Sequence, residues 1–407
     1  MSLYGTMRTG VSGMNAQANR LGTVGENIAN SSTVGYKKAG VQFSSMILPT
    51  TSGAYNSGGV ETTVRYAISQ QGTFSYTSSS TDLAVNGAGF FIVQGTDGTD
   101  YMTRAGSFVP MDDGTLQNAA GYTLMGYEYS STSEDPTIVI NGFDGLTPVN
   151  LASAGITATP SGAGTLQVNA PANEAIGFAK STSLIAIDSQ GNTRLLNFTY
   201  TKTAANTWTV SASYDNNGTA VSAMAAQTLT FGTDGKLLTP AAPSTVTTLP
   251  LGTAVLGGAV LPALTLDLTG TTQLAADFSV KGNIDGSQAS TVKGYEIDAD
   301  GIVSVSYSNG DLIPRYRVAL ANVQSPDNLR PIAGNLYTQS NSSGVVVLGY
   351  AGSSGFGEIL SGALEDSNVD VAEELTGMIE AQRNYTANSK VFQTGSELME
   401  VLVNLKR

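Results

Sequence analysis

The N-terminal segment carries apolar or small side chains in two rows, each with a spacing of seven residues. The first row is Met7, Met14, Leu21 and Ile28, and the second, offset by four, is Tyr4, Val11, Ala18 and Gly25. Rows with this offset occupy the a and d positions of a helix that packs in coiled-coil fashion. The pattern predicts a helix from about Leu3 to Asn30.

The C-terminal segment has a similar pattern. Its main apolar row is Met378, Tyr385, Phe392 and Met399, and its companion row is Leu375, Gln382, Ser389, Ser396 and Val403, apolar only at its ends. The pattern predicts a helix from Asp370 to the C-terminus, about 55 Å long at roughly 1.5 Å per residue. Asp370 with Glu373 indicates a capping box, and Lys406 with Arg407 would complement the helix dipole.

Both predicted helices are weak in isolation. Glycines interrupt the first at positions 5, 10, 13, 22 and 25, each costing about 1 kcal/mol relative to Ala in a helix interior. Polar residues interrupt the companion row of the second. One interpretation is two ordinary amphipathic helices lying on a globular core. We favour the other, that these helices depend on packed neighbours and become ordered on assembly.

Between the ends the sequence is typical of antiparallel β structure. Turn signals recur at Asn86-Gly87, Asp97-Gly98, Asp113-Gly114, Asn217-Gly218, Asp234-Gly235, Asp300-Gly301 and Asn309-Gly310. Alternating apolar and polar runs flank several of them, including Leu195–Tyr200, Thr207–Ser213 and Ile302–Tyr307. The predicted fold class is mainly β with α-helical termini, in which the two terminal helices pair as a coiled-coil-like stalk.

A shift in composition divides the β region. From about Asn150 to Ser290 the chain is very rich in Ala, Thr and Gly. We interpret residues 150–290 as an inserted outer domain, a β-sandwich or barrel, and residues 71–149 with 291–359 as an inner β domain. Residues 31–70 and 360–368 would connect the inner domain to the paired helices of residues 1–30 and 369–407.

Composition argues against catalysis and against several partners. The 407 residues include no Cys and no His, which removes the thiolate nucleophile, the usual general base and the commonest zinc ligands. The net charge of −13 would repel nucleic acid. The most apolar stretch, Val255–Leu268, is broken by Pro262 and Asp267 and is too short to span a bilayer. The N-terminus lacks the pattern of a cleavable secretory signal.

Two short motifs suggest ligand sites only weakly. The glycine-rich stretch from Gly87 to Ile92 lacks the third glycine and the following helix of a dinucleotide loop. The sequence from Asp298 to Gly301 has its glycine too early for a calcium loop, and no glutamate closes the site. We interpret both as turns and expect no catalytic residue, metal or cofactor.

Three long segments closely resemble bacterial flagellar rod and hook proteins. They read GVSGMNAQANRLGTVGENIANSSTVGYK at residues 10–37, TDLAVNGAGFFIV with TRAGSF at residues 81–93 and 103–108, and ALEDSNVDVAEELTGMIEAQRNYTANSKVF at residues 363–392. The residues carrying the resemblance are Asn27, Asn30, Gly35, Tyr36, Asn86, Gly87, Gly89, Phe90, Phe91, Arg104, Gly106, Leu364, Glu365, Ser367, Asn368, Val369, Gln382, Arg383 and Asn388. Their order along the chain matches that of the family.

Length and insertion favour the hook type within that family. The rod members are shorter and lack a large outer domain. Residues 183–215 and 297–310 also resemble the outer region of hook subunits and the return of the chain to the inner domain.

The resemblance implies a homopolymer, a curved hollow tube that joins the rod to the filament and transmits motor torque as a universal joint. The implied partners are further copies of the chain, the distal rod and hook–filament junction proteins, the hook cap and the flagellar type III export apparatus. It implies an extracellular location at the basal body, reached without a cleaved signal peptide, and no membrane insertion.

The predicted self-assembly surface lies on the two terminal helices, which would form the inner wall of the tube. Its residues are Met7, Val11, Met14, Ala18, Leu21, Ile28, Leu375, Met378, Ile379, Tyr385, Phe392, Met399 and Leu402. A contact of one patch with a different patch on the next copy generates a helical assembly when it does not close into a ring.

Three alternatives stay open at this stage. A distal rod protein would form a straight assembly that ends below the cell surface. An extracellular carbohydrate-binding or adhesive protein would use the outer domain, although the lone Trp208 offers little for stacking sugars. An acid hydrolase would rely on paired carboxylates.

Overall fold

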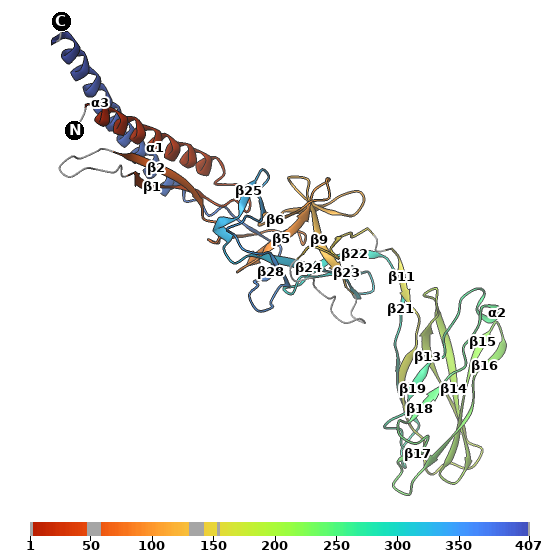
Figure 1. Cartoon of the computed structure of the whole chain (residues 1–407). Coiled ribbons are helices and arrows are strands. Elements are labelled where there is room, and N and C mark those ends of the chain that lie inside the picture. The colour runs from red at the N-terminus through yellow and green to blue at the C-terminus, as the bar shows by residue number, and fades with distance from the viewer. Residues whose placement is uncertain (1–2, 47–57, 130–141, 153–154, 406–407) are drawn as a thin grey trace. The chain divides into compact units, whose positions relative to one another are not determined.

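The computed structural model describes residues 3–46, 58–129, 142–152 and 155–405. The chain forms two compact units. The first contains residues 1–153, 295–305 and 312–407, and the second contains residues 154–294 and 306–311. Figure 1 shows the order of the elements along the chain. The predicted fold class, mainly β with helical termini, is confirmed.

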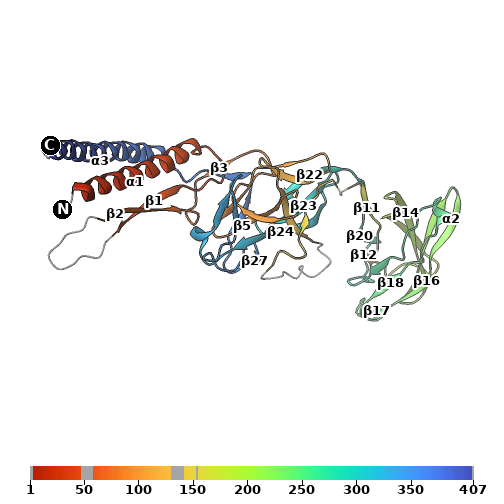
Figure 2. The same cartoon turned by 45° about the horizontal axis from the view of Figure 1, so that its top comes forward.

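The two terminal helices belong to the first unit and pack against each other. Helix α1 spans Leu3–Ala29 and α3 spans Val371–Leu405, which confirms both predicted helices. They lie side by side and antiparallel in Figures 1 and 2, with an ion pair of 3.1 Å between Arg20 and Glu380. Strands β1 (Ala39–Met46) and β2 (Gly59–Tyr66) form an antiparallel hairpin beside α1.

The start of α3 corrects one expectation. Asp370 caps the helix as predicted, since its Oδ1 accepts the backbone N–H groups of Ala372 at 2.8 Å and Glu373 at 3.2 Å. Glu373 does not complete a capping box, because its carboxylate forms an ion pair with Lys38 at 3.2 Å. The predicted charge complement at Lys406 and Arg407 lies outside the described residues.

The rest of the first unit is built around a twelve-stranded sheet within the described residues. Its main path runs β22-β23-β24-β9-β5-β6-β26-β25, with β7, β8, β10 and β27 attached. The strands are β5 (Phe90–Gln94), β6 (Asp100–Thr103), β7 (Phe108–Pro110), β8 (Leu116–Asn118), β9 (Thr123–Glu128), β10 (Thr147–Pro148), β22 (Val292–Ile297), β23 (Ile302–Tyr307), β24 (Leu312–Asn322), β25 (Arg330–Ile332), β26 (Leu336–Thr338) and β27 (Val347–Tyr350). A 3₁₀ turn, η1 (Pro326–Asn328), precedes β25.

Two smaller ladders complete this unit. Strand β4 (Leu83–Asn86) pairs with β28 (Glu358–Ser361), and β3 (Phe74–Tyr76) pairs with β29 (Ala363–Glu365). Both join the first third of the chain to the segment just before α3. The ladders therefore hold the C-terminal helix to the β framework through residues that are nearly 300 positions apart.

Strand β5 explains why the FFIV run lacks alternation. Phe91 and Val93 pack into one apolar cluster, whereas Phe90 and Ile92 pack into another. Successive side chains of a strand point to opposite faces, so a strand covered on both faces has no polar positions. The glycine-rich stretch before β5 is a turn into a strand, as the sequence predicts.

The second unit is a two-layered β structure. One layer is an antiparallel sheet in the order β13-β14-β15-β16-β17, and the other has the order β18-β19-β12-β20. Its elements are β11 (Thr157–Thr159), β12 (Ala163–Asn169), β13 (Ala179–Ile187), β14 (Thr193–Ala204), β15 (Thr207–Asn216), β16 (Thr219–Phe231), β17 (Leu237–Thr239), β18 (Thr245–Thr247), α2 (Thr253–Leu256), β19 (Thr265–Asp267), β20 (Ser279–Ile284) and β21 (Ser287–Ser290).

One core fills the space between these layers. Leu166 and Leu266 from one sheet and Phe198, Trp208 and Val210 from the other belong to the same buried cluster. The predicted alternating runs in β14 and β15 are confirmed, because every second side chain faces this core. All seven predicted Asn-Gly and Asp-Gly turns have their glycine at positive φ, at positions 87, 98, 114, 218, 235, 301 and 310.

Candidate assembly surface and its buried anchor

The polar edge of α1 is fixed to the β1–β2 hairpin. The Ser12 hydroxyl accepts the backbone N–H of Val60 at 2.8 Å and donates to its carbonyl at 2.9 Å. Asn27 is buried; its amide oxygen accepts the backbone N–H of Ala39 at 2.9 Å, and its amide nitrogen donates to the Ala39 carbonyl at 2.8 Å. These contacts hold the hairpin along one side of the helix.

Small residues form the seam between α1 and α3. A Cβ added at Gly10 would lie 3.3 Å from the backbone oxygen of Asn388, and one at Gly13 would lie 2.7 Å from the side chain of the same residue. On the opposite helix, a Cβ at Gly395 would lie 2.7 Å from Met7. Glycine therefore allows the two helices to approach closely at these positions.

This seam predicts that substitutions of two glycines in α1 have opposite effects on stability. Gly10→Leu should force the helices apart and destabilise the first unit by about 1–3 kcal/mol, as overpacking does. Gly22 has no neighbouring atom within 4 Å of an added Cβ, so Gly22→Ala should stabilise the helix by about 1 kcal/mol. Urea unfolding followed by helical circular dichroism measures both. Equal effects of the two substitutions would contradict this seam.

The apolar rows are only partly covered within one chain. The first row of α1 (Met7, Met14, Leu21 and Ile28) is half-buried. The second row differs from the expected seam, since Tyr4, Val11, Ala18 and Gly25 are exposed. Of the predicted assembly residues on α3, Met378 and Phe392 are half-buried, whereas Leu375, Ile379, Tyr385, Met399 and Leu402 are exposed.

Helix α3 continues past the beginning of α1, as Figure 2 shows. Met7, in the first turns of α1, lies opposite Gly395, whereas α3 extends to Leu405. Several apolar side chains in the last turns of α3 are exposed, namely Leu398, Val401, Leu402 and Val403. Leu398 and Leu402 are 53% and 55% exposed. A soluble monomer gains nothing from such a surface, and a contact with another chain would bury it.

A buried ion cluster anchors these helices to the β framework. Glu365 has a side chain with 0% exposure, and its carboxylate lies 2.6 Å from the Lys37 ammonium and 3.2 Å from the Arg104 guanidinium. It also accepts the backbone N–H of Gly72 at 2.9 Å. Burial lowers the pKa of Lys37 and Arg104, and the adjacent Glu365 carboxylate opposes this shift. The guanidinium also stacks over the ring of Phe90 at 5.0 Å.

Further motif residues surround this cluster. Asn368 accepts the backbone N–H of Lys38 at 2.8 Å and donates to the carbonyl of Ala67 at 3.0 Å. The Tyr36 hydroxyl donates to Asn27 at 3.2 Å. Burial, with help from the Glu26 carboxylate, raises the pKa of Tyr36 to about 12. The three sequence motifs therefore meet at one joint.

Backbone contacts place two motif glycines in the same joint. Gly35 has a φ of 69°, and a Cβ there would lie 2.6 Å from the backbone nitrogen of Ala105. A Cβ on Gly106 would overlap the backbone carbonyl of Leu83, so this position admits no side chain. Both positions require glycine for close approach.

The remaining motif residues have different surroundings. Asn86, Gly87, Gly89 and Phe91 lie at the β4–β5 turn or in β5; Leu364 lies in β29; and Ser367 and Val369 lie between β29 and α3. Asn30 donates to the Glu26 carbonyl at the end of α1. Asn388 faces the seam, whereas Gln382 and Arg383 are exposed and lie apart from the joint.

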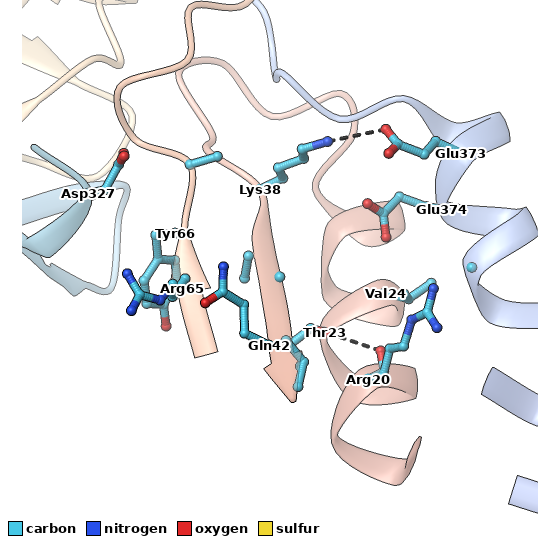
Figure 3. Close-up of a pocket in the computed structure, with 15 residues that line it drawn as sticks. Arg20, Thr23, Val24, Lys38, Gln42, Arg65, Tyr66, Asp327, Glu373 and Glu374 are labelled. Carbon is cyan, nitrogen blue, oxygen red and sulfur yellow. Dashed lines mark hydrogen bonds and ion pairs between the residues drawn. The ribbon is translucent and has the colours of Figure 1, made fainter. Parts of the chain in front are cut away.

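A polar groove of about 490 Å³ runs beside this joint (Figure 3). Side chains of α1, the β1–β2 hairpin and α3 line it. Arg20 and Lys38 form ion pairs with Glu380 and Glu373, so two of its cations are neutralised by α3. Among the described residues, no group of three or more acidic side chains could hold a metal ion. No helix in the described ranges is long and apolar enough to cross a membrane.

The sequence analysis did not predict that small residues form the helix seam or that charged residues form the buried cluster. Lys37 ends the first motif, and its partner Glu365 lies in the third, but nothing in either segment indicates that they meet. Gly10 and Gly13 carry a signal for the helix seam, but in the sequence alone they predict a cost to helix stability and not a contact surface.

Four protein-family models match successive parts of the chain. They are described as flagella basal body rod protein (residues 7–37), flagellar hook protein FlgE/F/G D1 domain (84–194), flagellar basal body protein FlaE D2 domain (150–286) and flagellar basal body rod FlgEFG protein C-terminal (360–405). These matches, with the helical termini around β units, define the class of flagellar rod and hook proteins.

Full-length relatives identify the family within that class. The flagellar hook protein FlgE of Rhizobium meliloti (strain 1021) is 60% identical over 412 residues, covering 100% of both chains. Those of Brucella suis and Escherichia coli K12 are 48% and 31% identical, covering 100% and 97% of this chain and 100% and 98% of their own. The chain belongs to the flagellar hook protein FlgE family, a family of structural proteins and not of enzymes.

A solved structure supports the fold. The crystal structure of Helicobacter pylori flagellar hook protein FlgE2 aligns with a TM-score of 0.52 and 16% identity. The alignment covers 70% of this chain and 98% of that one. At this identity the likeness concerns the fold alone.

Proposed function

We propose that this chain polymerises with copies of itself into the curved hollow tube of the flagellar hook, which couples rod to filament and transmits torque as a universal joint. The observation that carries the proposal is the exposed apolar surface on paired terminal helices. Leu398 and Leu402 alone could each contribute about 1.5–3 kcal/mol if a second copy buried them fully.

The domains have distinct roles in this proposal. Residues 1–30 and 369–407 form the tube wall, and residues 31–70 and 360–368 connect it to the inner β domain of 71–149 and 291–359. The inserted domain of residues 150–290 lies outside and tunes bending. The neighbouring partners are the distal rod and junction proteins, the cap and the type III export apparatus, with export to the cell exterior without a cleaved signal.

The distal rod and carbohydrate-binding alternatives have less support than this proposal. A distal rod protein is disfavoured by 60% identity to a hook protein over the full chain. A carbohydrate-binding role for the second unit is disfavoured because Trp208 is buried in its core, where it offers no platform to a sugar.

Deletion of residues 396–407 tests the proposal. The contact of Met7 with Gly395 stays in place, so the truncated chain should remain a folded monomer by circular dichroism and gel filtration. It should form no tubes in electron microscopy under conditions in which the full chain polymerises. Tubes formed by the truncated chain would contradict the assembly role of α3.

A further inference from the structure

Glu374, in the first turn of α3, has a buried carboxylate without a partner. The residue is 9% exposed, and within the described ranges its carboxylate forms no hydrogen bond or ion pair. Figure 3 shows the side chain pointing from α3 into the polar groove of about 490 Å³. A buried charge costs free energy unless an opposite charge accompanies it. This carboxylate can therefore bind a cation that enters the groove.

The cations that line the groove have other positions and partners. Lys38 pairs with Glu373 at 3.2 Å, and Arg20 pairs with Glu380 at 3.1 Å. Arg65 is exposed on β2 and forms no ion pair with any residue that the structure describes. It stands on the wall of the groove opposite α3, as Figure 3 shows. The groove therefore presents an unpaired carboxylate on one wall and an unpaired guanidinium on the other.

The unpaired charges of the groove define the charges that a ligand must carry. Apart from the two ion pairs, the lining has one cation, Arg65, and two carboxylates, Asp327 and Glu374, which leaves a net charge of −1. The Asp327 carboxylate accepts the backbone N–H and the hydroxyl of Ser69 at 2.7 and 2.9 Å, and neither of these groups neutralises it. A ligand with two cationic groups and one carboxylate matches this set.

The size and lining of the groove favour a small organic ligand. Its volume lies within the range of small-molecule sites. A metal ion such as Ca²⁺ takes about six to eight oxygen ligands, whereas the described part of the chain has no group of three or more acidic side chains that could hold one. The ring of Tyr66 and the amide of Gln42 also line the groove. They offer an aliphatic stem a surface to pack on and a polar end a hydrogen bond.

We propose that this groove binds a free basic amino acid of the lysine, ornithine or arginine type. The side-chain cation of the ligand pairs with Glu374, its α-carboxylate pairs with Arg65, and its α-ammonium faces Asp327. Each contact is a charge-assisted hydrogen bond, and the net charge of +1 on the ligand balances the groove. The ligand joins α3 to the β1–β2 hairpin and stabilises the first unit by binding its folded state. This site is independent of polymerisation.

Ligand-observed NMR tests the site with lysine as the probe and the full-length chain kept below the concentration at which it polymerises. Saturation transfer to lysine should give a dissociation constant on the order of 1 mM. Glu374→Gln should weaken binding by at least about tenfold, because an amide cannot supply a charged acceptor. Absence of saturation transfer in the wild type at ten times the expected constant would overturn the inference, as would equal binding by Glu374→Gln.

Three analogues of lysine test which of its groups the groove recognises. Norleucine lacks the side-chain ammonium and should not bind. Cadaverine lacks the α-carboxylate, so Arg65→Gln should weaken the binding of lysine but not that of cadaverine, in the manner of a double-mutant cycle. The Nα-acetyl derivative lacks the α-ammonium and should bind more weakly than lysine. If norleucine binds as tightly as lysine, the site does not recognise the cation. If the acetyl derivative does so, a basic side chain alone is sufficient. Either result contradicts the assignment to a free basic amino acid.

Two controls separate recognition from folding. Glu397→Gln removes one charge from an exposed position of α3 outside the groove and should bind lysine as the wild type does. Without ligand, Glu374→Gln should unfold near the wild-type urea concentration by helical circular dichroism, since its carboxylate has no partner in the chain to lose. Lysine should raise this midpoint in the wild type and not in the variant. A large fall of the midpoint in the variant without ligand would assign the carboxylate to a contact within the chain and overturn the inference.

Discussion

Glu365→Gln is expected to destabilise the first unit by about 3–5 kcal/mol, because it leaves the buried cations of Lys37 and Arg104 without their carboxylate. The amide can still accept the N–H of Gly72, so the change removes charge with little change of shape. Urea unfolding followed by helical circular dichroism should show the loss, since α1 and α3 belong to this unit.

Two comparisons make this expectation specific. Glu373→Gln removes the partner of Lys38 at the surface, where the Glu373 side chain is 68% exposed, and should change stability by no more than about 1 kcal/mol. Fluorescence of Trp208 follows unfolding of the second unit, because this residue lies in its core. The midpoint of that transition should stay at the wild-type urea concentration in both variants. Similar effects of the two glutamine substitutions would contradict the buried cluster as the anchor of the helices.

Leu398→Asp with Leu402→Asp is expected to abolish polymerisation at concentrations that suffice for the wild type. If a second copy buries each leucine, their loss removes about 3–6 kcal/mol of contact energy and raises the critical concentration on the order of 100-fold or more. Both side chains are exposed in the single chain, so the monomer should keep its thermal stability. Sedimentation and electron microscopy measure the polymer.

Ser396→Asp is a control for the effect of an added negative charge near this pair. It adds an aspartate at an exposed position of α3, two residues before Leu398, and removes no apolar surface. It should polymerise nearly as the wild type does. Equal loss in the control and in the leucine variant would indicate that negative charge, and not lost apolar contact, prevents assembly.

Local patterns were sufficient to predict the elements of the fold. The apolar rows with seven-residue spacing predict the ends of α1 and α3 to within a residue or two. The alternation in β14 and β15 follows because one face of their sheet lies on the core. Both signals arise from the burial of one side of an element, which repeats along a short stretch of sequence.

Contacts between distant segments were not predictable in this way. The predicted capping box does not form, because the Glu373 carboxylate pairs with Lys38, which lies more than 300 positions earlier in the chain. The seam of α1 with α3 uses Gly10, Gly13 and Gly395; glycine in a helix indicates room for close approach, but it does not indicate which segment approaches. The buried partners of Glu365 carry no local pattern at all.

The spread of the buried cluster along the chain has a consequence for the order of folding. Its charged members stand at positions 37, 104 and 365, whereas the second unit consists almost entirely of residues 154–294. A chain that emerges from its N-terminus can complete the second unit once its contiguous residues are free. The first unit cannot form its buried cluster until Glu365 has emerged, and Lys37 and Arg104 stay solvated until then. The stalk, formed by the paired terminal helices, is therefore the last part of the subunit to become anchored.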